Sequence, residues 1–419
     1  MEGTILEVSV PDAKWHDLAL YLHNQLHFDY LVSIVGMDWG ETVGCVYYLT
    51  STVDNSQVSV KIETADRENP LLHSVSDIWK SANLYEREVY DFFGIRFINH
   101  PDMRRLFLRN DWVGYPFRKD YNADPELNPI RLEHESVDDV THSVVETEDG
   151  KLEERTNTIF SPQEFVVNIG PQHPATHGVL RLRTSLDGET VKKIDVYCGY
   201  VHRGIEKLCE SLTYPQTLHF ADRLDYLSAQ QNRHAVCLCI EDALQVEVPA
   251  RAQYIRTIMD ELMRISSHLL FWSTFCMDLG GTTAFFYGFR DREKILDIFE
   301  ETCGARMTFN YYTIGGLMAD LHPDFQRTAA ALLEARDAHH HMLQTSSRGI
   351  LSEISCHGTL LLSKQKSGSC LCCTVCADAA PAFSDVTYQF VAPVLVPAPV
   401  CPPDLGQCIR SLSLRSAWL

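Results

Sequence analysis

The helical pattern of residues 249–280, PARAQYIRTIMDELMRISSHLLFWSTFCMDLG, is the feature that most constrains the fold. Its apolar residues recur at helical spacing, and Pro249 suits the first turn of a helix. At a rise of about 1.5 Å per residue, such a helix reaches about 45 Å. A chain with a helix of this length is predicted to contain a helical bundle.

Three further segments of the second half have helical patterns: 217–244, 284–304 and 323–343. Two segments before them, 165–170 and 179–199, have strand patterns, and Asp187-Gly188 is a hairpin signal between strands. Residues 159–343 are therefore predicted to form a domain in which a small sheet stands in front of a long-helix bundle.

The N-terminal residues 1–121 are predicted to form a small, separate α/β domain. Residues 12–26 have a helical pattern, and three short β-branched and aromatic runs predict strands: 30–39, 43–52 and 57–65. A second helix is predicted to start at Ser76 or Asp77 and to end at Gly94. The fold class of the whole chain is predicted to be α+β.

Two segments differ in character from these domains. Residues 122–158 contain eleven Asp or Glu against three Lys or Arg and have no sustained period, which predicts an acidic linker. Residues 344–419 lack an amphipathic period and are rich in Cys, Pro and Ser, so they are predicted to be an irregular tail translated in a shifted frame. The alternative is a metal module, but the cluster of Cys370, Cys372, Cys373 and Cys376 has no second pair at zinc-finger spacing.

Composition excludes several classes of function. The net charge of −20 argues against a broad nucleic-acid or anionic-membrane surface. The N-terminus shows no signal-peptide pattern, and no apolar run approaches the ~18 residues that span a bilayer. The nearest, 269–277, is closed by Asp278. Any membrane role is therefore expected to come through a partner.

The seven cysteines from Cys45 to Cys303 are predicted to be buried free thiols.

Several polar motifs leave more than one interpretation open. His173 and His177 in GPQHPATHGVLRL are turn residues, a weak metal pair or proton donors. If VHRGIEKLCESL is helical, His202 and Glu206 share a face. This stretch is either a charged helix start or a cationic group that tunes a neighbouring redox centre. The aromatic and charged run 85–121 is predicted to be a docking surface with internal ion pairs.

Three other positions carry a structural and a functional alternative. Tyr226 is a core residue with a satisfied hydroxyl, or a group of a binding site. Asp278 is a simple helix-end carboxylate, or it orients a histidine. The run His339–His341 is a surface helix end, or a metal site.

Long motifs in serial order carry a family resemblance. GPQHPATHGVLR, HRGIEKL, DRLDYLSA, MDLGGTTAFF and YYTIGGL resemble the D subunit of respiratory complex I, the quinone-site subunit of NADH:quinone oxidoreductase. EREVYDFFGIRFINHPDMRRL and GYPFRKDY resemble the C subunit, so the chain resembles the fused C–D form of some bacteria. The resemblance covers about residues 1–340 and implies a D-like fold related to the large subunit of nickel–iron hydrogenases.

The resemblance implies roles for four residues. It makes His177 the donor of a hydrogen bond to the quinone headgroup, with Tyr226 facing it and Asp278 pairing with the histidine. It places Arg203 near the terminal iron–sulfur cluster, which the partner B subunit binds, and leaves His173 as a structural neighbour. Quinone is then a substrate, and this chain binds no metal. The residues after Glu206 give only Cys209 and no C-x-x-C, which argues against nickel.

The resemblance also implies partners and a location. The partners are the sibling B, I and membrane subunits and the membrane quinone, with no nucleic acid, at the cytoplasmic face of the bacterial inner membrane. Thr308 stands where many members have a histidine near the cluster, and the family continues past residue 340, where this chain has its unusual tail. The alternatives are a non-functional frame-shifted fragment or non-catalytic assembly subunit, and a metal hydrolase that uses the histidines.

Overall fold

The computed structural model describes residues 6–110, 112–122, 140–147, 149–173 and 178–332. The chain divides into two compact units, residues 1–207 and 208–419. The first 49 residues of the predicted 159–343 domain lie in the first of these compact units. The reason is that this segment packs on the N-terminal domain, where Asp195 pairs with the buried Arg104 at 3.0 Å.

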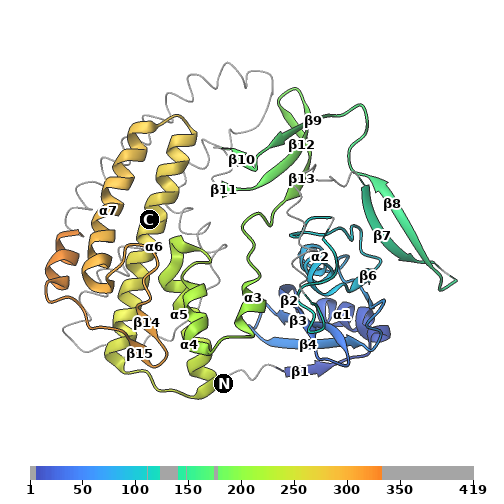
Figure 1. The fold of residues 1–419 in the computed structure, drawn as a ribbon, viewed down its shortest axis with the longest axis horizontal. Helices are drawn as coiled ribbons and strands as arrows, with labels where there is room; N and C mark the ends of the chain where they lie inside the picture. Colours follow the sequence, from blue (N-terminus) through green and yellow to red (C-terminus); the bar gives the residue numbers. More distant parts are fainter. Residues whose placement is uncertain (1–5, 111, 123–139, 148, 174–177, 333–419) are drawn as a thin grey trace. The chain divides into compact units, whose positions relative to one another are not determined.

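The first unit begins with a four-stranded sheet in the order β1-β4-β3-β2. Its strands are β1 (Leu6–Ser9), β2 (Tyr30–Asp38), β3 (Val43–Thr50) and β4 (Gln57–Thr64). Two helices, α1 (Trp15–Asn24) and α2 (Ala82–Phe93), share one apolar core with this sheet (Figure 1). Alternate residues of β3 point into that core, where Tyr47 meets the ring of Trp15 at 4.6 Å. The three predicted strands and the first helix are confirmed.

The predicted start of the second helix is wrong. Helix α2 begins at Ala82 rather than at Ser76 or Asp77. The preceding residues turn back instead, because the Ser74 hydroxyl and the Val75 amide donate to the buried Glu86 carboxyl at 2.6 and 2.9 Å. The predicted end is confirmed, since Gly94 closes the helix with a φ of 75°.

A second sheet corrects the prediction for the acidic linker. Its order is β5-β6-β7-β8, with strands β5 (Leu71–His73), β6 (Arg96–Ile98), β7 (Val140–Glu146) and β8 (Leu152–Thr158). The second half of residues 122–158 is thus a β-hairpin, while residues 123–139 lie outside the described residues. Every residue of β8 is exposed, so this strand carries no alternation of apolar and polar residues that the sequence could reveal.

The strands predicted around residues 165–199 are confirmed as a third sheet. Strand β12 (Arg181–Asp187) lies between β9 (Phe165–Ile169) and β13 (Thr190–Tyr197), antiparallel to both. Asp187 pairs with Thr190, so the hairpin loop consists of two residues, of which Gly188 has a φ of 60°. A short helix, α3 (Ile205–Cys209), follows.

The second unit is helical, as predicted. Helix α6 (Ala250–Asp278) has 29 residues and packs along α7 (Thr282–Cys303), which ends at Gly304 (Figure 1). Two short strands, β14 (Tyr312–Thr313) and β15 (Gly316–Leu317), complete the order of elements. Residues 325–332 are helical, and the rest of the predicted 323–343 helix lies outside the described residues, as does the 344–419 tail.

The single helix predicted over residues 217–244 is wrong. The structure has α4 (Tyr214–Ala221), a 3₁₀ turn η4 (Tyr226–Ser228) and α5 (Ala229–Leu244) instead. The helix is interrupted where Asp222 turns inward, accepting from Arg233 at 3.0 Å and from the Asn310 amide at 2.9 Å. Asp225 then caps the turn by accepting from the Leu227 amide.

Two predictions concern the membrane and the thiols. Within the described residues, no helix is both long and apolar enough to cross a membrane. The seven cysteines from Cys45 to Cys303 are free, as predicted, but they are not all buried. Cys239 is exposed, and three others are only partly covered.

Candidate functional site

The HPATH segment follows a two-stranded ribbon. Strand β10 (Gln172–His173) pairs antiparallel with β11 (Gly178–Val179), so that His173 lies opposite Gly178. Residues 174–177, and with them His177, lie outside the described residues. Gly170 enters this ribbon with a φ of 89°, and a Cβ there would stand 1.8 Å from the Leu180 carbonyl oxygen. Only glycine fits this close approach of two backbones.

The HRG segment lies on the N-terminal domain. Helix α3 begins only at Ile205, so the condition under which His202 and Glu206 would share a helical face is not met. The His202 ring instead stacks on the rings of Phe92 and Phe107, each at a centroid distance of 4.9 Å. Arg203, the next residue, is exposed.

Tyr226 and Asp278 both belong to the second unit. The Tyr226 side chain in η4 is 53% exposed, so the alternative in which it is a core residue is wrong. Asp278 is the last residue of α6 and is exposed, as the helix-end alternative predicts. Turn η4 packs against α6, which carries Asp278 at its C-terminal end.

A buried ion pair joins helices α5 and α6. The Arg256 guanidinium of α6 donates to both oxygens of Glu241 on α5, at 2.9 and 2.7 Å. It also donates to the carbonyl oxygens of Thr313 and Gly316 at 2.8 and 3.0 Å. Because the Arg256 side chain is 0% exposed, these contacts stand in for water at its two terminal nitrogens, while Nε is buried without a hydrogen-bond partner.

A second buried group links a histidine, an aspartate and a tyrosine. Asp260 on α6 lies 2.5 Å from the His234 Nδ1 atom on α5, and it accepts from the Tyr312 hydroxyl at 2.8 Å. Burial raises the pKa of the Asp260 carboxyl, against the hydrogen bond from His234. We did not predict this group from the sequence. The available signal was the pair Arg256 and Asp260, two charges one turn apart on the apolar face of a helix.

The 85–121 region contains the internal ion pairs that were predicted. Asp91 is fully buried and accepts from Arg105 at 2.9 Å. Its other oxygen accepts from three successive backbone amides, those of Leu106, Phe107 and Leu108, at 3.1, 2.7 and 2.9 Å. The carboxylate therefore fixes the loop that presents the Phe107 ring to His202.

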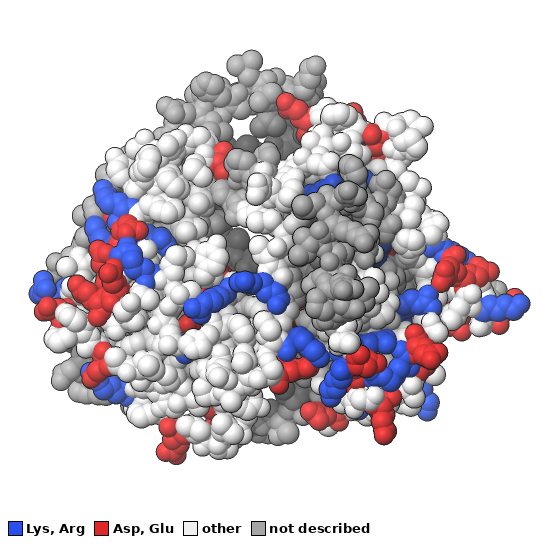
Figure 2. Space-filling model, viewed as in Figure 1, with Lys and Arg blue, Asp and Glu red and all other residues white. Residues whose placement is uncertain are grey.

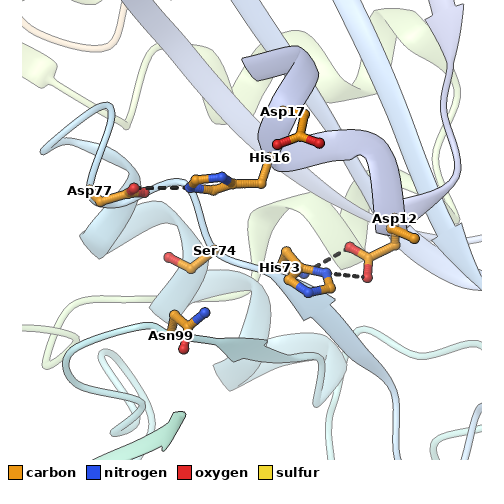
Figure 3. A pocket seen from close by; sticks show the side chains of 8 residues that line it. Asp12, His16, Asp17, His73, Ser74, Asp77 and Asn99 are labelled. Carbon is orange, nitrogen blue, oxygen red and sulfur yellow. Dashed lines mark hydrogen bonds and ion pairs between the residues drawn. The ribbon is translucent and has the colours of Figure 1, made fainter. Parts of the chain in front are cut away.

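The cavity of about 330 Å³ in Figure 3 is lined by none of the predicted site residues. Two histidine–carboxylate pairs line it: His73 with Asp12 at 2.7 Å, and His16 with Asp77 at 2.9 Å. Asp12 also accepts from the His73 backbone amide, which ties the first helical turn to β5. In the described part of the chain, no group of three or more His, Cys, Asp or Glu side chains is arranged to hold a metal ion.

The buried Glu86 next to this cavity gives a pH-dependent prediction. Burial raises its pKa to about 8, from an ordinary value of 4.5. Between these values the folded state holds a proton that the unfolded state has lost. Stability therefore falls as pH rises, by up to about 1.4 kcal/mol per pH unit. Glu86→Gln should remove this slope. Urea unfolding at several pH values measures the difference, and equal slopes in both proteins would contradict the prediction.

The surface charges are mixed rather than separated. On the face shown in Figure 2, Lys and Arg lie among Asp and Glu in the same clusters. One such cluster lies at α7, where Arg306 pairs with Glu293, Asp297 and Glu300. The net charge of −20 therefore does not form a single negative field on this face.

Comparison with known proteins gives the context of these motifs. Residues 8–126 match the family described as respiratory-chain NADH dehydrogenase, 30 Kd subunit, and residues 278–348 match the corresponding 49 Kd subunit family. A relative from Phocaeicola vulgatus, a C/D subunit of NADH-quinone oxidoreductase, is 62% identical over 319 residues. Over three quarters of its length the chain is similar to C/D subunits of NADH-quinone oxidoreductase.

Other C/D subunits are similar to this chain over two thirds to three quarters of its length. The alignment with the Phocaeicola vulgatus relative covers 76% of this chain and 61% of that protein. The relative from Bacteroides thetaiotaomicron is 59% identical, over 75% of this chain and 61% of its own length. The C/D 2 subunit of Aquifex aeolicus is 42% identical, over 66% of this chain and 48% of its own length. The chain thus spans about three fifths of the C/D subunits from Phocaeicola and Bacteroides.

Proposed function

We propose that this chain forms the quinone-reduction site of a complex I-type oxidoreductase. Its partners would be the B subunit, which carries the terminal iron–sulfur cluster, the I subunit and the membrane subunits. The single observation that carries this proposal is the position of Tyr226 in the DRLDY motif. A phenol ring that is 53% exposed stabilises little of the core and is accessible to a ligand.

The proposed chemistry is the reduction of a membrane quinone to a quinol. Two electrons arrive from the partner's cluster, and two protons form the O–H bonds of the product. His177 and Tyr226 are the proposed donors of these protons, because an imidazolium and a phenol can each release one to a reduced quinone oxygen. Asp278 is the proposed counter-charge of His177. Arg203 is proposed to face the partner's cluster as a fixed positive charge, and this chain is proposed to bind no metal.

We also propose which part of the chain corresponds to which subunit. Residues 1–121 are the C-like part, and 159–343 are the D-like part that carries the motifs. The proposed site of action is the cytoplasmic face of the bacterial inner membrane, where the chain is held by its partner subunits. The comparisons support this interpretation rather than the frame-shifted or assembly-only alternative. The 49 Kd family match ends at residue 348, close to the start of the unusual tail.

Substitution of the proposed proton donors tests this function. In membranes with the assembled complex, Tyr226→Phe and His177→Ala should each lower quinone reductase kcat by about 100-fold, a common loss when one acid is removed. Electron transfer from NADH to an artificial acceptor that does not use the quinone site should be unchanged.

The matched control is Tyr214→Phe, at a 66% exposed tyrosine on α4 outside the motif, which should keep wild-type quinone turnover. The same substitutions are made at the matching residues of the Phocaeicola vulgatus complex. Wild-type quinone turnover in both donor variants, in either complex, would refute the roles of His177 and Tyr226. If this chain supports no activity while the relative's complex responds as expected, the assembly-only alternative holds for this chain.

A further inference from the structure

The first residue of the HRG segment, His202, packs on aromatic rings of the N-terminal domain. The His202 ring stacks on Phe92 of α2 and on Phe107, with interplanar angles of 27° and 28°. Phe117 stacks in turn on Phe92, at 4.2 Å and 11°. The imidazole is thus a half-buried member of a stacked aromatic cluster.

Backbone contacts on both sides of Arg203 reinforce this arrangement. The His202 amide donates to the Gly199 carbonyl oxygen at 2.9 Å, and the Gly204 amide donates to the His202 Nδ1 atom at 3.2 Å. Because Nδ1 accepts this bond, it carries no proton, and the ring bridges the peptide groups that flank Arg203.

Two further contacts hold the ends of the segment on the same domain. Gly199 has a φ of 100°, and a Cβ there would lie 2.2 Å from the Phe107 carbonyl oxygen. Lys207 donates to the Phe117 carbonyl oxygen at 3.3 Å. The backbone that carries Arg203 is therefore fixed at residues 199, 202, 204 and 207, whereas the Arg203 side chain is exposed.

We propose that His202 is a positioning residue for Arg203. The His202 ring stacks on Phe92 and Phe107 and accepts from the Gly204 amide, and these contacts set the direction in which the Arg203 side chain projects. The inference rests on the proposed function, in which Arg203 faces the partner's cluster. Its consequence is that the C-like domain, which contributes none of the proposed quinone residues, tunes the redox centre through this aromatic contact.

The midpoint potential of the partner's terminal cluster, titrated by EPR in the assembled complex, tests the inference. A nearby positive charge stabilises the reduced cluster, so Arg203→Gln should shift the potential to lower values. His202→Leu should give a smaller shift of the same sign, because it removes both the stack and the acceptor. His202→Phe, which restores the ring, should recover most of the wild-type potential. Val201→Ala, next to the motif at a 70% exposed side chain, is the matched control and should leave the potential unchanged.

The outcomes separate the inference from the function on which it rests. If Arg203→Gln shifts the potential and His202→Leu does not, the positioning role is wrong and the role of Arg203 stands. If Arg203→Gln leaves the potential unchanged, the proposed role of Arg203 fails and the inference fails with it. If His202→Leu prevents assembly, Phe107→Leu takes its place, because it removes one side of the stack and should also lower the potential. A wild-type potential in that variant would overturn the inference.

Discussion

Asp91→Ala is expected to destabilise the N-terminal unit by about 3–5 kcal/mol, the usual cost of leaving a buried ionic group without its partner. The substitution removes the carboxylate that accepts from Arg105 and from three backbone amides, and it leaves Arg105 with only backbone carbonyl oxygens as acceptors. These hydrogen bonds are partly buried in the folded protein, so water replaces them only in part. The loop at Phe107, which holds the HRG segment, should lose its order first.

Urea unfolding of the full chain, followed by fluorescence of the buried Trp15 and Trp79, measures the change for Asp91. The matched control is Asp120→Ala. Asp120 also pairs with an arginine, Arg67, at 3.1 Å, but its side chain is 60% exposed. That change should cost less than about 1 kcal/mol. Equal effects of the two substitutions would contradict the role assigned to Asp91.

Glu241→Ala is expected to have a comparable effect in the second unit, again about 3–5 kcal/mol. It leaves Arg256 charged and buried, and it removes the acceptor of the Gly315 amide at 2.7 Å. The contacts that remain for Arg256 are two carbonyl oxygens, which carry only partial charge. This pair joins the C-terminal part of α5 to the N-terminal part of α6.

A double variant separates the ionic contribution of Glu241 from its packing. Glu241→Leu combined with Arg256→Met removes both charges and should be less destabilising than Glu241→Ala alone, because no unpaired charge stays buried. Asp320→Ala is the matched control, since its pair with Arg251 at 2.9 Å is 63% and 64% exposed. Chemical unfolding followed by far-UV circular dichroism gives all three values. A double variant that is less stable than the single one would contradict this account.

The sequence predicted the elements whose own pattern specifies them. Helix α6 was predictable from its apolar stripe, and the β12–β13 hairpin from Asp187-Gly188 between alternating strands. Strand β8 was missed because none of its residues is buried. The start of α2 was missed because it depends on a bond from Ser74 to Glu86, a contact between a turn and the helix interior that no local pattern reports.

The candidate site divides in the same way. The sequence pointed to His177, Arg203, Tyr226 and Asp278 as candidates, because each of them lies within a short motif that is continuous along the chain. The stack of His202 on Phe92 joins residues far apart in the sequence, and the His234–Asp260 pair joins two different helices. Such contacts follow from tertiary packing, so they become visible only when the fold is known.

Labelling of the assembled complex with a photoreactive quinone tests the central claim most directly. After illumination, the labelled peptides of this chain are identified by mass spectrometry, with and without an excess of unlabelled quinone. The account predicts label in the peptides that contain His177 and Tyr226, and its suppression by the competitor. Label confined to other peptides, or label that the competitor does not suppress, would contradict the claim that this chain forms the quinone site.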